Sequence, residues 1–294
     1  MRFLTFRKNQ NALSEVGILS EDGQSVIPVK DFGLGFSSMN ELISGMTAEQ
    51  YGLIKEQLKD KTGFRLSEVI KMAPIPEPRQ DIICLGMNYS AHAREFGDYN
   101  KDYKENIPKA IYFSKRVNLA IPDGGSVSAH SDLVKKLDYE VELAVILGRD
   151  AKNVTPENAF DYIFGYSIIN DFTARDLQEQ HKQWYFGKSL DGFTAFGPWI
   201  VTKDEIPDAE KLDIKCWVNN ELRQNSNTSM LIHRIGEIMS ELSSGMTLKA
   251  GTIIATGTPA GVGIGFTPPK FLVPGDVVKC EIEGIGSITN YITD

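Results

Sequence analysis

The chain has 294 residues, of which 41% are hydrophobic and 24% charged, which predicts one large folded domain or two unequal ones. Its formal net charge of −8 argues against nucleic acid as a partner, because binding phosphates requires a basic surface. No apolar run approaches the roughly 20 residues that cross a bilayer, and the first residues lack the apolar segment of a signal peptide, so no membrane partner is expected. Cys84, Cys216 and Cys280 are widely spaced in apolar contexts, which predicts buried thiols of a cytoplasmic protein.

The first 72 residues are expected to form a small α+β unit. Two strand-like stretches lie within the first 19 residues, and a helix is expected to begin at Thr47, where T-A-E-Q forms a capping box. Residues 73–80 hold three prolines within five positions, which cannot continue a helix and favour an extended linker. We therefore predict a small N-terminal domain of residues 1–72, a proline-rich linker of residues 73–80 and a catalytic domain of residues 81–294.

Beyond residue 81 the pattern is one of strands and loops with few helices. One helix is predicted from about Ser229 to Leu242, because its apolar residues share one stripe and Gly245 follows. Numerous strands without alternating helices argue against a doubly wound sheet and predict a β-rich α+β fold. The predicted strands, rich in Val, Ile and aromatic residues, are 81–85, 109–114, 139–147, 162–169, 199–202, 213–218, 252–255 and 277–282.

The most informative of these strands reads L-D-Y-E-V-E-L-A-V-I-L over residues 137–147. Side chains alternate along a strand, so Glu140 and Glu142 point to the same face. Like charges at this spacing repel each other and partial burial raises their pKa values, so an offsetting cation is expected. Asp171 ends the next apolar run and can face them, and three carboxylates suit Mg²⁺ or Mn²⁺, with Ca²⁺ possible. The alternative is an acidic strand edge exposed to water.

A second candidate is the segment N-Y-S-A-H-A-R-E-F-G at residues 88–97. Ser90 can cap a short helix there, which places His92 and Glu95 on one face. A glutamate bound to a histidine fixes its tautomer and raises its basicity, as in a general base that acts on water. A helix of barely two turns is marginal alone and could be a lid that substrate orders. An ordinary surface pair is the alternative.

Two further segments carry polar groups among glycines and aromatic residues. Lys188, within F-G-K-S-L-D-G-F, could stabilise an enolate or a carboxylate, although most lysines are solvated. The glycine-rich run at residues 253–265 is neither a Walker loop nor a Rossmann fingerprint. Its backbone amides and the Thr258 hydroxyl could cradle a carboxylate, unless the run is only a tight structural loop.

Taken together, these motifs resemble those of the fumarylacetoacetate hydrolase superfamily over about residues 81–290. The likeness rests on the paired-glutamate strand, the lysine segment, the glycine-rich loop, and G-M-N-Y followed by His92 and Glu95. The segment G-Y-S-I-I-N-D-F-T-A-R-D-L-Q at residues 165–178 also matches. The resemblance implies the family's mixed β-roll, a small N-terminal domain of the kind many bacterial members carry, and a homodimer.

The resemblance also implies roles for ten residues. The metal ligands would be Glu140, Glu142 and Asp171. The catalytic residues would be His92 and Glu95, which activate water, and Lys188, which stabilises the enolate. The residues near the bound oxoacid would be Tyr89, Arg175, Gln178 and Thr258, although Arg175 could instead be the buried partner of a carboxylate.

The activity implied is that of a Mg²⁺- or Mn²⁺-dependent hydrolase that cleaves a carbon–carbon bond in a β-diketo acid of the acylpyruvate or fumarylpyruvate type. The bond would break to leave a pyruvate-type enolate, so the expected partner is a small 2-oxo or diketo acid. Alternatives on the same site are an oxaloacetate decarboxylase, a dienedioate isomerase and a keto-deoxy sugar acid hydrolase or dehydratase. A non-catalytic oxoacid-binding protein is a further alternative, which the presence of both the His–Glu pair and the lysine disfavours.

Overall fold

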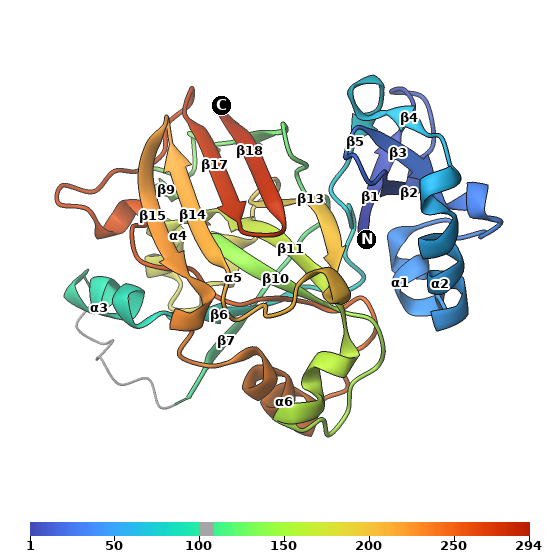
Figure 1. Cartoon of the computed structure of the whole chain (residues 1–294). Helices are drawn as coiled ribbons and strands as arrows, with labels where there is room; N and C mark the ends of the chain where they lie inside the picture. The colour runs from blue at the N-terminus through green and yellow to red at the C-terminus, as the bar shows by residue number, and fades with distance from the viewer. Residues whose placement is uncertain (100–108) are drawn as a thin grey trace.

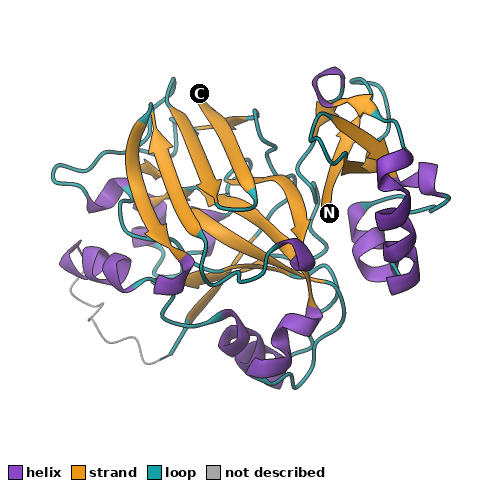
Figure 2. Ribbon diagram, viewed as in Figure 1, coloured by secondary structure: helices purple, strands orange, loops and turns teal. Residues whose placement is uncertain are grey.

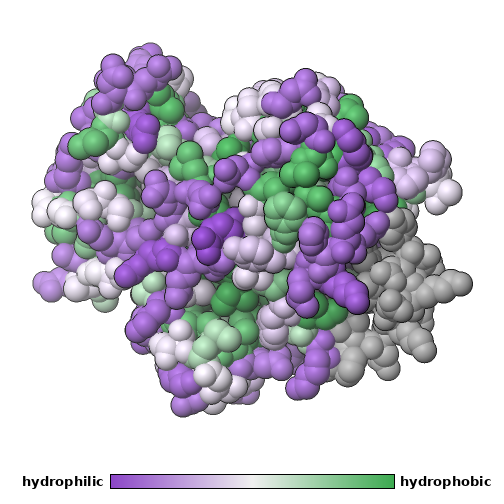
Figure 3. All heavy atoms as spheres, turned by 180° about the vertical axis from the view of Figure 1, so that it is seen from behind, coloured by the Kyte–Doolittle hydropathy of each residue, from purple (hydrophilic) through white to green (hydrophobic). Residues whose placement is uncertain are grey.

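A computed structural model describes residues 1–99 and 109–294 and has the β-rich α+β architecture predicted from the sequence. The strands form the centre of the molecule and most helices lie at its edges (Figure 2). Seen from behind, the hydrophobic surface is divided into separate patches among hydrophilic side chains (Figure 3). Within the described ranges, no helix combines the length and the hydropathy that a membrane span requires.

The leading unit lies beside the larger body, at the blue end of the colour scale (Figure 1). Its elements are β1 (Arg2–Arg7), β2 (Glu15–Leu19), β3 (Ser25–Pro28), α1 (Met39–Gly45), α2 (Ala48–Gln57), β4 (Phe64–Arg65) and β5 (Ile70–Lys71). Helix α2 begins as predicted, since Thr47 and Gln50 form the capping box. Strand β1 pairs with β13 (Thr194–Thr202), with Phe3 opposite Ile200, so the unit continues the sheet of the body.

The largest sheet has eleven strands and runs from the leading unit through the centre of the body. Its order is β4-β3-β2-β1-β13-β11-β10-β16-β6-β7, and β5 pairs with β1. Strands β16 and β6 are parallel, with Ile254 opposite Ile83, whereas β10 and β11 are antiparallel. The bounds of the body strands are β6 (Ile82–Gly86), β7 (Ile111–Lys115), β10 (Val141–Leu147), β11 (Ile163–Asp171) and β16 (Ile253–Ala255).

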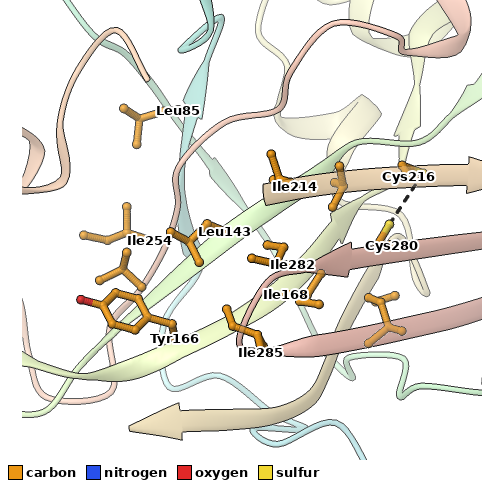
Figure 4. Close-up of a cluster of buried hydrophobic side chains, with 14 of the residues drawn as sticks. Leu85, Leu143, Tyr166, Ile168, Ile214, Cys216, Ile254, Cys280, Ile282 and Ile285 are labelled. Atoms are coloured by element: carbon orange, nitrogen blue, oxygen red, sulfur yellow. Dashed lines mark hydrogen bonds between the residues drawn. The ribbon is translucent and has the colours of Figure 1, made fainter. Parts of the chain in front are cut away.

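A second sheet covers one face of β10 and β11, and the main core lies between the two sheets. Ile214 and Ile282 of this sheet meet Leu143 and Ile168 of the large one (Figure 4). In order, its strands are β15 (Glu221–Asn227), β14 (Asp213–Val218), β17 (Val277–Ile282), β18 (Gly286–Thr293) and β8 (Ser126–Ser128). All three cysteines are buried free thiols, as predicted, and the Sγ atoms of Cys216 and Cys280 are 3.8 Å apart.

The strand at residues 137–147 is buried on both faces, which explains its nearly unbroken apolar sequence. It is interrupted after β9 (Leu137–Asp138), which pairs with β12 (Thr173–Ala174), and resumes as β10. Leu143 and Val145 face the main core, whereas Ala144 and Ile146 face a second core shared with the leading unit. Glu140 and Glu142 therefore continue the face of Ala144 into the interior, and the water-exposed acidic edge is excluded.

The prediction of a helix from about Ser229 to Leu242 was wrong at its start. A 3₁₀ turn covers Thr228–Met230, and helix α6 runs only over Ile235–Gly245. The segment between them is held in a non-helical, bent conformation, because the Asn88 side chain accepts from the backbone N–H of His233 at 2.8 Å and donates to its carbonyl at 3.1 Å. Apolar periodicity alone did not reveal this tertiary contact.

The start of the predicted linker packs into the protein. Ala73 and Ile75 are fully buried in the second core, and the Thr5 hydroxyl donates to the Pro74 carbonyl at 2.7 Å. The division into two domains at residues 73–80 stays a prediction. Both this segment and strand β1 connect the leading unit to the body.

Candidate active site

Three carboxylates meet where β10 and β11 lie side by side. Glu142 belongs to β10, Glu140 immediately precedes it, and Asp171 is the last residue of β11. The Asp171 N–H donates to the Glu140 carbonyl at 2.8 Å, which fixes the two chain segments against each other. One carboxylate oxygen from each residue lies within 4.8 Å of the others, and all three side chains are buried. The structure thus brings together the predicted metal ligands.

Two lysines compensate part of this negative charge. The Lys188 ammonium lies 2.7 Å from Glu140 Oε2 and 2.8 Å from Asp171 Oδ2, and Lys115 donates to Asp171 Oδ1. Burial alone raises the pKa of Glu140, but Lys188 and Arg175 outweigh that effect and lower it to about 2. The same carboxylates raise the pKa of Lys188 against the opposing effect of its burial, so it stays charged.

Glu142 forms no ion pair with any lysine or arginine in the part of the chain described. It accepts one backbone hydrogen bond, from the Gly257 N–H at 2.8 Å. Burial raises its pKa well above the ordinary value, and the nearby Asp171 and Glu140 add to this effect. Carboxylate oxygens are hard ligands, and divalent cations such as Mg²⁺ and Mn²⁺ prefer such ligands. A divalent cation bound by these three residues would also balance the negative charge of Glu142.

The His92–Glu95 pair lies on α3 (Ser90–Tyr99) and is not an ordinary surface pair. His92 is only 4% exposed, and its Nδ1 lies 3.1 Å from Glu95 Oε2. Glu95 also accepts from the Gly261 N–H at 3.1 Å, so the glycine-rich loop holds it in place. A Cβ at Gly265 would lie 1.8 Å from Glu95 Oε1, which shows how closely this loop packs on the pair.

Arg175 begins α4 (Arg175–Gln180) and is the buried partner of two carboxylates. Its Nε donates to Asp138 Oδ2 at 2.9 Å, and its second terminal nitrogen lies 2.7 Å from Glu140 Oε1. Asp138 in turn accepts from the Gly263 N–H at 2.6 Å. These contacts connect the predicted ligand Glu140 to the glycine-rich loop. They favour the alternative in which Arg175 orders the site through carboxylates.

One small cavity joins most of the predicted residues. It is lined by Leu85, Gly86, Met87, His92, Phe113, Glu140, Arg175, Gln178, Trp184, Lys188 and Thr258. The Thr258 hydroxyl accepts from Gln224 Nε2 at 2.7 Å, and Gln178 accepts from Arg175 at 3.1 Å. Glu95, Glu142, Asp171 and Tyr89 are not among the lining residues. Tyr89 is 1% exposed within the main core, where its backbone forms a bridge with Leu231.

Sequence reasoning missed three residues that support this site. Lys115 pairs with Asp171, Asp138 pairs with Arg175, and Gln224 joins Thr258 to the backbone of Val141. The available signal for Lys115 was a cation at the end of the strand-like run I-Y-F-S, although Arg116 follows it directly. Nothing in the local pattern around Gln224 indicates its role, because its partners come from two distant segments.

Three buried carboxylates, a buried lysine and a His–Glu pair lie close together in this β-rich fold, a combination that is typical of metal-dependent enzymes. Residues 81–293 match the family model described as fumarylacetoacetate (FAA) hydrolase C-terminal, and the chain belongs to this family.

Its relatives have several named activities. The chain is 47% identical over 230 residues to the oxaloacetate tautomerase YisK of Bacillus subtilis, covering 78% of this chain and 75% of that one. A fumarylacetoacetate hydrolase structure from Exiguobacterium antarcticum is 39% identical, with a TM-score of 0.83 over 100% of this chain and 99% of that one. The maleylpyruvate hydrolase of Sphingobium sp. SYK-6, solved with manganese(II) and pyruvate, is 28% identical, with a TM-score of 0.79 and the same coverage.

Proposed function

We propose that the chain is a divalent-metal-dependent enzyme that forms the enolate of a 2-oxo acid, and that its reaction is keto–enol tautomerisation of a small 2-oxo diacid such as oxaloacetate. The observation that carries the proposal is that His92, Lys188 and Glu140, one of the three clustered carboxylates, line a single cavity. The 47% identity to an oxaloacetate tautomerase supports the choice of reaction.

Glu140, Glu142 and Asp171 would hold the cation. A Mg²⁺ or Mn²⁺ ion held by these residues would supply polarisation of the 2-oxo group and positive charge where the enolate develops. The Lys188 ammonium lies against the same carboxylates and stays protonated, so it adds a second positive charge at this end of the cavity.

His92 is the base in this proposal. Glu95 binds Nδ1, which fixes the orientation and the tautomer of the ring, so the other ring nitrogen transfers the proton. Neutral His92 removes a proton from C3, the C–H electron pair becomes the C2=C3 double bond, and the C2 oxygen takes the negative charge. Delivery of that proton to the oxygen gives the enol, and the reverse sequence gives the ketone.

Hydrolysis of a β-diketo acid is the second candidate, and the sequence motifs predicted it. The His92–Glu95 pair favours it, since the same base can take a proton from water. Hydroxide then attacks the distal carbonyl, and the carbon–carbon bond breaks so that its electron pair forms the enolate. The likeness to the maleylpyruvate hydrolase supports this candidate.

The two candidates are separated by assaying the purified protein with and without Mn²⁺. We expect loss of enol absorbance from oxaloacetate to be faster than the spontaneous rate, with no carbon dioxide released. Production of a carboxylate and pyruvate from an acylpyruvate would indicate hydrolysis, and carbon dioxide release would indicate a decarboxylase. No acceleration with any of these acids would contradict the proposed function.

The variant His92→Ala tests the base directly. We expect turnover to fall about 10²- to 10⁴-fold, because general acid–base catalysis contributes about that much, while Mn²⁺ affinity is retained. Calorimetry with Mn²⁺ is the matched control for folding. Unchanged turnover would remove the His92–Glu95 pair from the mechanism.

A further inference from the structure

The cavity lining includes four apolar side chains, those of Leu85, Met87, Phe113 and Trp184, together with charged residues such as Lys188 and Glu140. A 2-oxo acid would place its charged end against Lys188 and Glu140, which leaves the apolar side chains to contact its distal group. Trp184 is the largest of these apolar side chains.

The position of Trp184 is fixed by a glycine and an aromatic ring. A Cβ at Gly86 would lie 2.2 and 2.6 Å from two carbons of the indole, so the ring rests directly on the backbone of β6. The Phe113 ring meets the indole edge-on, with centroids 5.2 Å apart. A residue with a side chain at position 86 would therefore displace the indole.

Trp184 is also tied to the catalytic lysine. It immediately precedes helix α5 (Tyr185–Lys188), and its carbonyl accepts from the Lys188 N–H at 3.1 Å. The Lys188 ammonium lies 5.2 Å from the centroid of Phe113. Trp184 and Lys188 therefore belong to one helical turn, so a large displacement of the Trp184 indole would also displace the Lys188 ammonium.

The space beside the four apolar lining side chains, the apolar wall, is small. The centre of a water molecule can move through only about 20 Å³ of the cavity, which is room for about one water. Any 2-oxo acid, including one with a carboxylate-sized distal group, therefore requires the lining to adjust. A phenyl ring or a long alkyl chain would have to displace the indole from Gly86.

We propose that Trp184, seated on Gly86 and Phe113, sets the size limit of the substrate. Its wall admits 2-oxo acids with a small distal group, such as a carboxylate, and excludes 2,4-dioxo acids with an aryl or long alkyl end. This inference rests on the proposed function for the 2-oxo acid end, and it holds for either reaction candidate.

The test is calorimetric binding of two probes to the Mn²⁺-loaded protein, oxalate as the small one and 4-phenyl-2,4-dioxobutanoate as the large one. We expect Trp184→Ala to tighten binding of the large probe roughly tenfold or more, the order seen when contacts in an apolar pocket change. Oxalate affinity should change by less than about threefold, since oxalate does not reach the wall. Tyr185→Ala is the matched control, because Tyr185 is adjacent but 40% exposed and does not line the cavity.

A double-mutant cycle tests whether the Trp184 indole packs on Gly86, and this test needs no ligand. Gly86→Ala should lower the melting temperature, because its Cβ collides with the indole. Adding Gly86→Ala to Trp184→Ala should lower it much less, since the colliding ring is gone. Equal losses in both backgrounds would show that the indole does not rest on Gly86.

The outcomes separate this inference from the proposed function. Tight oxalate binding with an unchanged ratio of the two affinities in Trp184→Ala would overturn the size limit and leave the function intact. A changed ratio without turnover of any 2-oxo acid would overturn the function and support the wall. Failure of both probes to bind any variant would overturn both.

Discussion

Glu142 is the carboxylate of the candidate site whose negative charge no ion pair balances within the described residues. It is buried beside Asp171 and Glu140, and no lysine or arginine of the described chain pairs with it. Its raised pKa means that, without metal, the folded state binds a proton more tightly than the unfolded state, whose glutamates titrate near 4.5. Metal binding and stability are therefore linked through this side chain.

The variant Glu142→Gln separates these two effects. In chelator-treated wild-type protein, the contribution of Glu142 is fully present below pH 4.5 and is lost as the pH rises toward the higher pKa of the folded state. Glutamine keeps the shape and removes this loss, so at pH 7 the variant should melt at a higher temperature than metal-free wild type. It should also bind Mn²⁺ more weakly. A lower melting temperature than metal-free wild type, with Mn²⁺ affinity unchanged, would contradict the assignment.

Asp138 is a second residue whose charge has structural consequences. It accepts hydrogen bonds from the Gly263 and Ile264 N–H groups and from Arg175. Asp138→Asn leaves the Arg175 guanidinium buried with one charged partner fewer, which should destabilise the fold by about 3–5 kcal/mol in urea unfolding. Asp213→Asn, which breaks an exposed ion pair with Lys215, is the control and should change stability very little. Similar small effects for both would show that Asp138 is not essential to the buried network.

At the level of elements, the site depends on the close packing of α4 against α5. Helix α4 carries Arg175 and Gln178, and helix α5 carries Lys188. A Cβ at Gly187 would lie 2.6 Å from the Gln178 nitrogen and 2.8 Å from the Ala174 carbonyl oxygen. Both are backbone atoms, so only glycine permits this distance between the helices.

Gly187→Ala should therefore separate the helices, destabilise the protein by about 1–3 kcal/mol and reduce turnover by displacing Lys188. The same substitution at Gly52 in α2 is the matched control, because a Cβ there meets no atom within 4 Å. Gly52→Ala should stabilise the protein by about 0.5–1 kcal/mol and leave turnover unchanged. Equal stability of the two variants in urea would contradict the packing argument.

For the whole molecule, the sheet connects the leading unit to the body that carries the site. Strand β1 pairs with both β2 and β13. The Tyr51 hydroxyl donates to Asp204 at 2.5 Å, and the Lys55 ammonium lies 3.1 Å from the same carboxylate group. The two parts also share the second hydrophobic core.

We expect the chain to unfold as one cooperative unit. Tryptophan fluorescence, which comes from Trp184, Trp199 and Trp217 in the body, should change at the same urea concentration as far-ultraviolet circular dichroism, which reports the whole chain. An earlier dichroism transition, accompanied at most by the fluorescence change of Trp199, which packs against the leading unit, would show that this unit unfolds by itself.

Short sequence patterns predicted those features of the molecule that depend on residues close together in the chain. The alternation around Glu140 and Glu142, the capping box at Thr47 and the buried thiols could all be read from short segments. The position of Asp171 at the end of an apolar run indicated the third carboxylate, and the resemblance added the β-roll. These predictions concern residue chemistry and short periods, which a single sequence displays.

The remainder depends on contacts between distant segments. The pairing of Lys115 with Asp171, the links of Gln224 and the start of α6 after the Asn88 contact join residues far apart in the sequence. Pairing of β1 with β13 is of the same kind, since no local signal indicates which strand accepts the leading unit. Tyr89 was predicted to lie near the oxoacid. In the structure it lies in the main core, where contacts with distant segments of the chain position it.

The central claim, that three buried carboxylates hold a divalent cation, is tested most directly by anomalous diffraction from crystals soaked in manganese. The account predicts a single strong anomalous peak bounded by Glu140, Glu142 and Asp171, and no such peak in Glu142→Gln crystals. A wild-type map with no peak between these carboxylates, or with its manganese bound elsewhere, would contradict the account.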